Sequence, residues 1–113
     1  MKEQVQALLA SLKANEAPFS KVIEFIDTHY QHHPTAFKNG DAYNEATQNQ
    51  GSARVFAFAK LNNLSAEDAL YLFAEHYRAV LATPQGTDHQ NIRQFMANGW
   101  GGIVFEGKVL TAK

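Results

Sequence analysis

The stretch that decides the fold is ARVFAFAKL, residues 53–61. Its apolar side chains occupy most of the circumference of a helix, and a helix that is apolar on nearly every side is buried. The preceding residues 44–52 are polar and rich in Asn and Gln, and Ser52 after Gly51 is a suitable N-cap. We therefore predict a helix over 53–61, capped by Ser52, in the middle of the core.

Further segments have the spacing of amphipathic helices, with apolar residues at i, i+3, i+4 and i+7. The first, residues 2–14, carries four apolar residues from Val5 to Leu12 on one stripe. The second is expected to begin at Ser20 and to stop before Pro34, because the residue before a proline disfavours the helical conformation. Two more helices are predicted over 65–81, capped by Ser65, and over 88–98.

Two short hairpins complete the predicted elements. Asn39-Gly40 lies between β-compatible pieces and predicts a hairpin near 35–45. Residues 103–110 predict two short strands around Glu106-Gly107. The expected fold class is α+β and mainly helical, with about five helices and a small antiparallel sheet from the two hairpins, in a single domain over residues 1–113.

Composition excludes several classes of protein. The chain has 113 residues, no cysteine, and 10 Lys+Arg against 11 Asp+Glu. Without cysteine there are no disulfides, thiolate metal sites or thiol nucleophiles. The net charge of −1 argues against binding to nucleic acid. No apolar run is long enough for a signal peptide or a membrane span, so we expect a cytoplasmic protein with no membrane partner. No motif calls for a cofactor.

A weak metal candidate lies at the end of the second predicted helix. His29 and His33 are spaced i, i+4, which would let two imidazoles reach one ion. A third ligand is missing from the pattern, and histidines near a helix C-terminus also interact favourably with the helix dipole. The sequence therefore favours no metal site.

Two polar segments hold the candidate ligand-binding residues. Residues 44–52 contribute Asn44, Glu45 and Ser52, and the start of the 88–98 helix contributes His89, Asn91 and Arg93. A pocket between these segments could bind a small anionic ligand, with Arg93 as the fixed cation and His89 as a donor or general acid/base. The two segments also have structural interpretations. The amides would then satisfy backbone groups, and Arg93 would pair with Glu45 or another carboxylate in a clamp.

Trp100, the one indole of the chain, lies between Gly99 and Gly101. Glycine neighbours permit close approach of a ligand, whereas a lone Trp in a small domain is more often a core anchor. No complete catalytic motif is present, so the sequence leaves open whether the protein is an enzyme.

Several motifs in order resemble the HopJ type III effector family of bacterial proteins. They are the Phe-x-Asn-Gly at 37–40, Asn-Glu-Ala at 44–46, Gly-Ser at 51–52, Phe-Ala-Phe-Ala at 56–59, Gly-Thr-Asp-His-x-Asn-Ile-Arg at 86–93, and Gly-Trp at 99–100. The resemblance implies an effector delivered into a host cell, where it would bind a host protein, or a cytoplasmic relative that is not secreted. It carries over no catalytic residue or cofactor. The N-terminus has an amphipathic helix pattern instead of the mobile, Ser-rich sequence typical of exported effectors.

Overall fold

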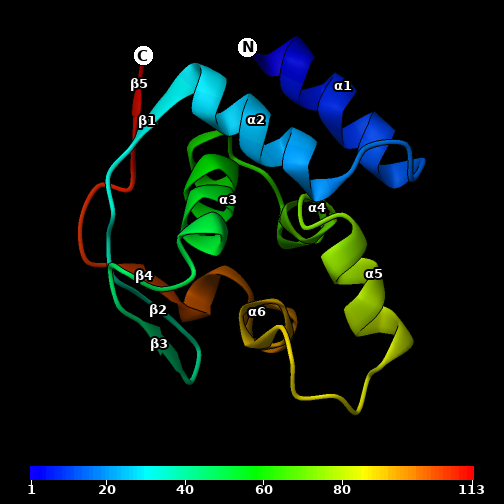
Figure 1. The fold of residues 1–113 in the computed structure, drawn as a ribbon, viewed down its shortest axis with the longest axis vertical. Coiled ribbons are helices and arrows are strands. Elements are labelled where there is room, and N and C mark those ends of the chain that lie inside the picture. Colours follow the sequence, from blue (N-terminus) through cyan, green and yellow to red (C-terminus); the bar gives the residue numbers. More distant parts are fainter.

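The computed structural model describes residues 1–113 and confirms a mainly helical α+β fold (Figure 1). No helix is long and apolar enough to cross a membrane. The elements, in chain order, are α1 (Lys2–Lys13), α2 (Phe19–His29), β1 (Tyr30–His32), β2 (Phe37–Asn39), β3 (Ala42–Asn44), α3 (Gln50–Leu61), α4 (Ala66–Tyr71), α5 (Glu75–Ala82), α6 (Gln90–Asn98), the 3-10 helix η1 (Gly99–Gly102), β4 (Ile103–Phe105) and β5 (Leu110–Ala112).

Helix α3 lies at the centre of the molecule, as its apolar sequence predicts, with the other elements arranged around it (Figure 1). All residues from Val55 to Ala59 are buried. The ring of Phe56 is the hub, with its centroid 4.8 Å from that of Phe95 and 5.2 Å from that of Phe73. Rings from α4–α5 and α6 thus converge on one central side chain.

The predicted helix over 65–81 is divided in two. Ser65 caps α4 as expected, since its Oγ accepts a hydrogen bond from the backbone N–H of Asp68 at 3.1 Å. The helical path then breaks at Ala74, whose φ of 52° and ψ of −123° are not helical. Helix α5 begins at Glu75 in a new direction, which raises the number of α-helices from about five to six.

The predicted starts and ends of two other helices shift. Helix α3 begins at Gln50 with Asn49 as N-cap, so Ser52 is inside the helix and does not cap it. Helix α2 begins at Phe19, before Ser20, and ends at His29 well before Pro34. It stops early because residues 30–32 form β1, which is paired with β5 from the other end of the chain.

The strands form two small antiparallel sheets. The predicted hairpin near 35–45 is present as β2 and β3, with Gly40 at φ 57° in the turn. The segment 103–110 contains strands, but they do not pair with each other: β4 pairs with β2, and β5 pairs with β1. The reason is burial, since Val109 and Leu110 enter the core and carry the chain from one sheet to the other.

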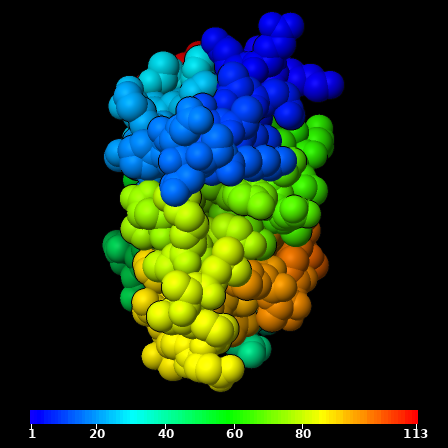
Figure 2. Space-filling model, turned by 90° about the vertical axis from the view of Figure 1, so that its right-hand side faces the viewer, coloured from blue at the N-terminus to red at the C-terminus, as the bar shows by residue number.

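Helices and the loops that join them form most of one face of the molecule (Figure 2). Figure 2 shows α1 and the start of α2 at one end, α4 and α5 in the middle, and the loop before α6 at the opposite end. The starts of α2, α5 and α6 therefore follow one another along the molecule.

Candidate functional site

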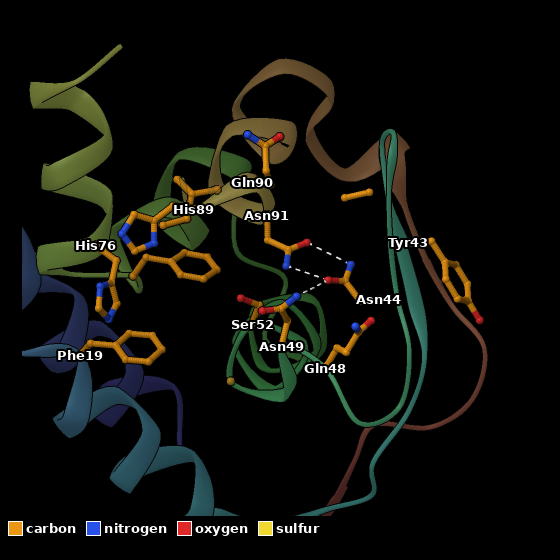
Figure 3. A pocket seen from close by; sticks show the side chains of 14 residues that line it. Phe19, Tyr43, Asn44, Gln48, Asn49, Ser52, His76, His89, Gln90 and Asn91 are labelled. Carbon is orange, nitrogen blue, oxygen red and sulfur yellow. Dashed lines mark hydrogen bonds between the residues drawn. The ribbon is translucent and has the colours of Figure 1, made fainter. Parts of the chain in front are cut away.

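A cavity of about 570 Å³, which we call the amide pocket, lies between β3, the start of α3 and the start of α6 (Figure 3). Its volume is within the range of ordinary small-molecule sites. No Lys, Arg, Asp or Glu lines it. The lining residues are Phe19, Ala42, Tyr43, Asn44, Gln48, Asn49, Gly51, Ser52, Phe73, His76, His89, Gln90, Asn91 and Ile92.

One wall of the pocket is fixed by four asparagines, which we call the asparagine network. Asn44 and Asn91 exchange two hydrogen bonds through their side-chain amides, at 3.1 and 3.0 Å. Asn49 Nδ2 donates to Asn44 Oδ1 at 2.7 Å, and Asn39 Nδ2 donates to Asn91 Oδ1 at 3.0 Å. Asn39, Asn44 and Asn91 are buried. Because each amide orients the next, this wall is rigid before any ligand arrives.

The helix starts beside this network are left without side-chain caps. The N-cap residues Asn49 and His89 both have left-handed backbone, with φ of 50° and 51°, and neither side chain caps its helix. Asn49 instead uses its amide on the network. The backbone N–H groups of Gly51, Ser52 and Asn91 consequently donate to no protein acceptor. Such groups carry the positive end of the helix dipole.

The opposite side of the pocket is a row of rings, which we call the ring wall. Phe19 lies parallel to Phe73 with centroids 6.1 Å apart, and the edge of His76 meets Phe19 at 4.9 Å. His89 continues the row, 5.2 Å from His76. In Figure 3 the rings of Phe19, His76 and His89 lie across the pocket from Asn44, Asn49 and Gln48. The pocket therefore has one aromatic side and one amide side.

A carboxylate behind the ring wall holds it in place. Glu75 Oε1 accepts a hydrogen bond from the backbone N–H of Phe19 at 2.8 Å, which joins the starts of α2 and α5. Burial opposes the charge on Glu75, but hydrogen bonds from the N–H of Phe19 and from its own N–H lower the pKa of this carboxyl overall. The folded protein thus stabilises the charged form of the Glu75 carboxylate.

Four of the predicted site residues, namely Asn44, Ser52, His89 and Asn91, line the amide pocket. Glu45 does not; its side chain is exposed to solvent. Arg93 does not line it either and forms no ion pair with Glu45.

Arg93 has a structural role that the sequence allowed. Its guanidinium pairs with Asp88 at 2.7 Å and donates to the carbonyl of Thr83 at 2.9 Å, which ties down the loop before α6. The hydrogen bond from Arg93 lowers the pKa of Asp88. This is the clamp interpretation of Arg93, with Asp88 in place of Glu45.

Trp100 lies outside the pocket and acts as a core anchor. Its indole N–H donates to the carbonyl of Leu64 at 3.1 Å, and its ring packs edge-on against Phe95 at 5.0 Å. The glycines on either side of it serve η1.

The histidines at the end of α2 have separate partners. His33 Nε2 is 2.9 Å from the Thr111 hydroxyl, and His29 packs on the ring of Phe25 at 4.5 Å. No group of three or more His, Asp or Glu side chains is placed to hold a metal ion.

Sequence reasoning missed the ring wall. Phe19 precedes the predicted start of its helix, and Phe73 and His76 lie on either side of the unpredicted break at Ala74. No spacing within the sequence brings these residues together. Asn49, by contrast, belongs to the Asn- and Gln-rich segment, whose unusual composition did signal a site.

Comparisons with known proteins agree with the motifs. The model of the HopJ type III effector protein family matches residues 5–110, nearly the whole chain. The chain belongs to the HopJ family. This HopJ-family chain is also similar to the crystal structure of a protein described as being of unknown function, VPA0580, with 43% identity and a TM-score of 0.88 over 96% of this chain and 92% of that chain. No curated protein matches it. The function must therefore be argued from the pocket.

Proposed function

We propose that this HopJ-family protein acts by binding a small polar molecule in the amide pocket. The observation that carries the proposal is a cavity of about 570 Å³ whose wall is already ordered and still offers unused hydrogen-bonding groups. Pre-ordered walls lower the entropic cost of binding, because few side chains must be immobilised when the ligand enters.

Two classes of ligand are compatible with these groups. An anion, the ligand predicted from the sequence, would meet the free N–H groups at the starts of α3 and α6 and the imidazoles of His76 and His89. A neutral hydroxylated molecule would use the amides as well. Arg93, expected to be the cation for an anionic ligand, is engaged outside the pocket by Asp88.

The geometry does not favour an enzyme. Ser52 is the serine of the pocket lining that could act as a nucleophile. No hydrogen bond joins its hydroxyl to the imidazole of His76 or of His89 (Figure 3). A serine nucleophile needs an adjacent base within hydrogen-bond reach. We therefore assign the pocket to binding.

A thermal-shift screen tests the proposal. The compounds are inorganic phosphate, citrate, acetate, maltose and cellobiose, each at increasing concentration. At 100 times its Kd, a ligand adds about 2.7 kcal/mol to the stability of the native state, a shift in Tm of many degrees for a chain of this size. We expect at least one compound to give a saturable rise in Tm.

A pair of glycine variants locates the binding. Gly51→Leu places a side chain in the pocket, where an added Cβ meets only the ring of Phe19 at 3.9 Å, so the fold should tolerate it. Gly101→Leu is the matched control, since a Cβ there meets nothing within 4 Å and the residue lies outside the pocket. The rise in Tm should vanish in the first variant and persist in the second. An equal rise in both variants would place the binding elsewhere.

We also propose that the chain is a relative of the HopJ effectors that stays in the cytoplasm. The support is α1, in which Val5, Leu9 and Leu12 are buried in the core, whereas export signals are mobile. A secretion reporter fused to residues 1–30 in a secretion-competent bacterium should be retained. Export of the reporter would contradict this proposal and direct attention to a host protein as partner.

A further inference from the structure

We infer that the ligand of the amide pocket is a neutral, hydroxyl-bearing ring of the sugar type. This inference rests on the proposed function and narrows it to one chemical class. Three features of the pocket support it: hydrogen-bonding groups that the protein leaves unused, the ring wall, and a lining without fixed charge.

The amides that border the pocket leave both donors and acceptors unused. Asn49 spends its Nδ2 on Asn44, so its Oδ1 is free to accept. Gln90 spends its Nε2 on the carbonyl of Thr87, which leaves its Oε1 free. Gln48 has the opposite pattern, because its Oε1 accepts from the N–H of Glu45 and its Nε2 stays free to donate.

This mixture discriminates between ligands. The charged oxygens of phosphate and carboxylate only accept hydrogen bonds. They would satisfy Gln48 and the free backbone N–H groups but would face the free oxygens of Asn49 and Gln90. Each hydroxyl of a sugar both donates and accepts, and can satisfy groups of either kind. Leaving desolvated acceptors without partners costs binding free energy, so the amide side favours the hydroxylated ligand.

The ring wall supplies the second half of the match. Phe19 is partly exposed across from the amides, and its ring is backed by the parallel ring of the buried Phe73. A sugar ring has an apolar face of C–H groups and an edge of hydroxyls, and aromatic rings are suitable partners for such a face. A ligand held between the two sides therefore needs an apolar face toward the ring wall and polar groups toward the amides.

Charge agrees with this assignment. No Lys, Arg, Asp or Glu lines the pocket. The nearest arginine on α6, Arg93, has its guanidinium bound to Asp88 and to the carbonyl of Thr83. A site for a strongly charged ligand is normally built with an opposing fixed charge.

Isothermal titration calorimetry with the full chain tests the inference. The neutral probes are maltose, cellobiose and chitobiose; the anionic probes that serve as competitors are inorganic phosphate and citrate. We expect saturable binding of at least one of the neutral sugars and none of the competitors. Ser52→Ala removes a hydroxyl of the lining and should weaken the sugar about three- to tenfold. Ser20→Ala, on exposed surface outside the pocket, is the matched control and should change binding less than twofold.

A second variant addresses the ring wall. Phe19→Leu keeps an apolar side chain but removes the flat ring, and should weaken the sugar by a similar factor while the unfolding midpoint shows that the protein is folded. Binding of phosphate or citrate without the sugars would overturn this inference and leave the proposed function standing. Failure of every probe to bind would overturn both.

Discussion

At the scale of single residues, the asparagine network should be a large source of stability. Asn91→Ala removes the side-chain bonds of residue 91 to the buried amides of Asn39 and Asn44, although Asn39 Nδ2 keeps the backbone carbonyl of residue 91 and Asn44 Oδ1 keeps Asn49. A buried polar group left without a partner costs about 1–3 kcal/mol. Because both amides keep one other partner, we expect Asn91→Ala to lower the free energy of unfolding by about 1–2 kcal/mol, measured by urea denaturation with circular dichroism.

Asn98→Ala is the matched control on the same helix. The Asn98 side chain is exposed and bonds only to Gln94 one turn earlier, so its loss should change stability by less than about 0.5 kcal/mol. Equal urea midpoints for the two variants would show that the network does not hold the fold together.

At the scale of the elements, the break between α4 and α5 stores backbone strain. Ala74 has φ 52° and is 2% exposed, in a conformation that suits glycine. Relief of such strain is worth about 1–3 kcal/mol, against about 0.5–1 kcal/mol for the flexibility of glycine and about 0.8 kcal/mol for the buried methyl. These contributions nearly cancel, so we expect Ala74→Gly to change stability by no more than about 1 kcal/mol in either direction.

The control is Ala69→Gly, which has the same chemistry in the ordinary helical backbone of α4. Ala69 is fully buried, so this variant should lose about 1–2 kcal/mol. Thermal unfolding of both variants is the measurement, and the decisive result is the difference between them. A loss as large at position 74 as at position 69 would mean that Ala74 is not strained.

The same elements show what the sequence can predict. The central helix follows from one short apolar stretch, and the β2–β3 hairpin follows from Asn39-Gly40, because both signals are local. The break at Ala74 has no local signal, since alanine is the best helix former. The pairing of β1 with β5 joins residues about 80 positions apart, and no spacing within either strand reveals its partner.

At the scale of the whole molecule, the candidate site depends on how the helices pack. The polar side of the pocket was predictable, because Asn44 and Asn91 belong to segments of unusual composition. The ring wall was not, because Phe19 and His76 meet only when the starts of α2 and α5 come together. Arg93 is two residues after the pocket residue Asn91, but its guanidinium points to Asp88 and not into the pocket. Sequence spacing does not give the direction in which a side chain points.

This packing also makes the folded state sensitive to acid. Partial desolvation raises the pKa of Glu75, but hydrogen bonds lower it overall, and the hydrogen bond from Arg93 lowers the pKa of Asp88 in the native state. The unfolded chain therefore binds more protons at low pH than the native protein does, and stability falls as pH falls. The contribution of these groups should be complete above their ordinary values of 4.5 and 3.8 and be lost as pH drops below them.

Glu75→Gln separates the charge from the hydrogen bond. The amide oxygen can still accept from the N–H of Phe19, but it has no proton to gain, so Tm should be lower than wild type at pH 7 and the difference should shrink as pH falls through 4.5. Glu16→Gln removes an exposed carboxylate that forms no ion pair, and its profile should follow the wild type. Parallel Tm curves for Glu75→Gln and wild type down to pH 3 would show that the Glu75 charge does not link α5 to α2. The hydrogen bond from the Phe19 N–H, which the amide keeps, would then join the two helices without help from the charge.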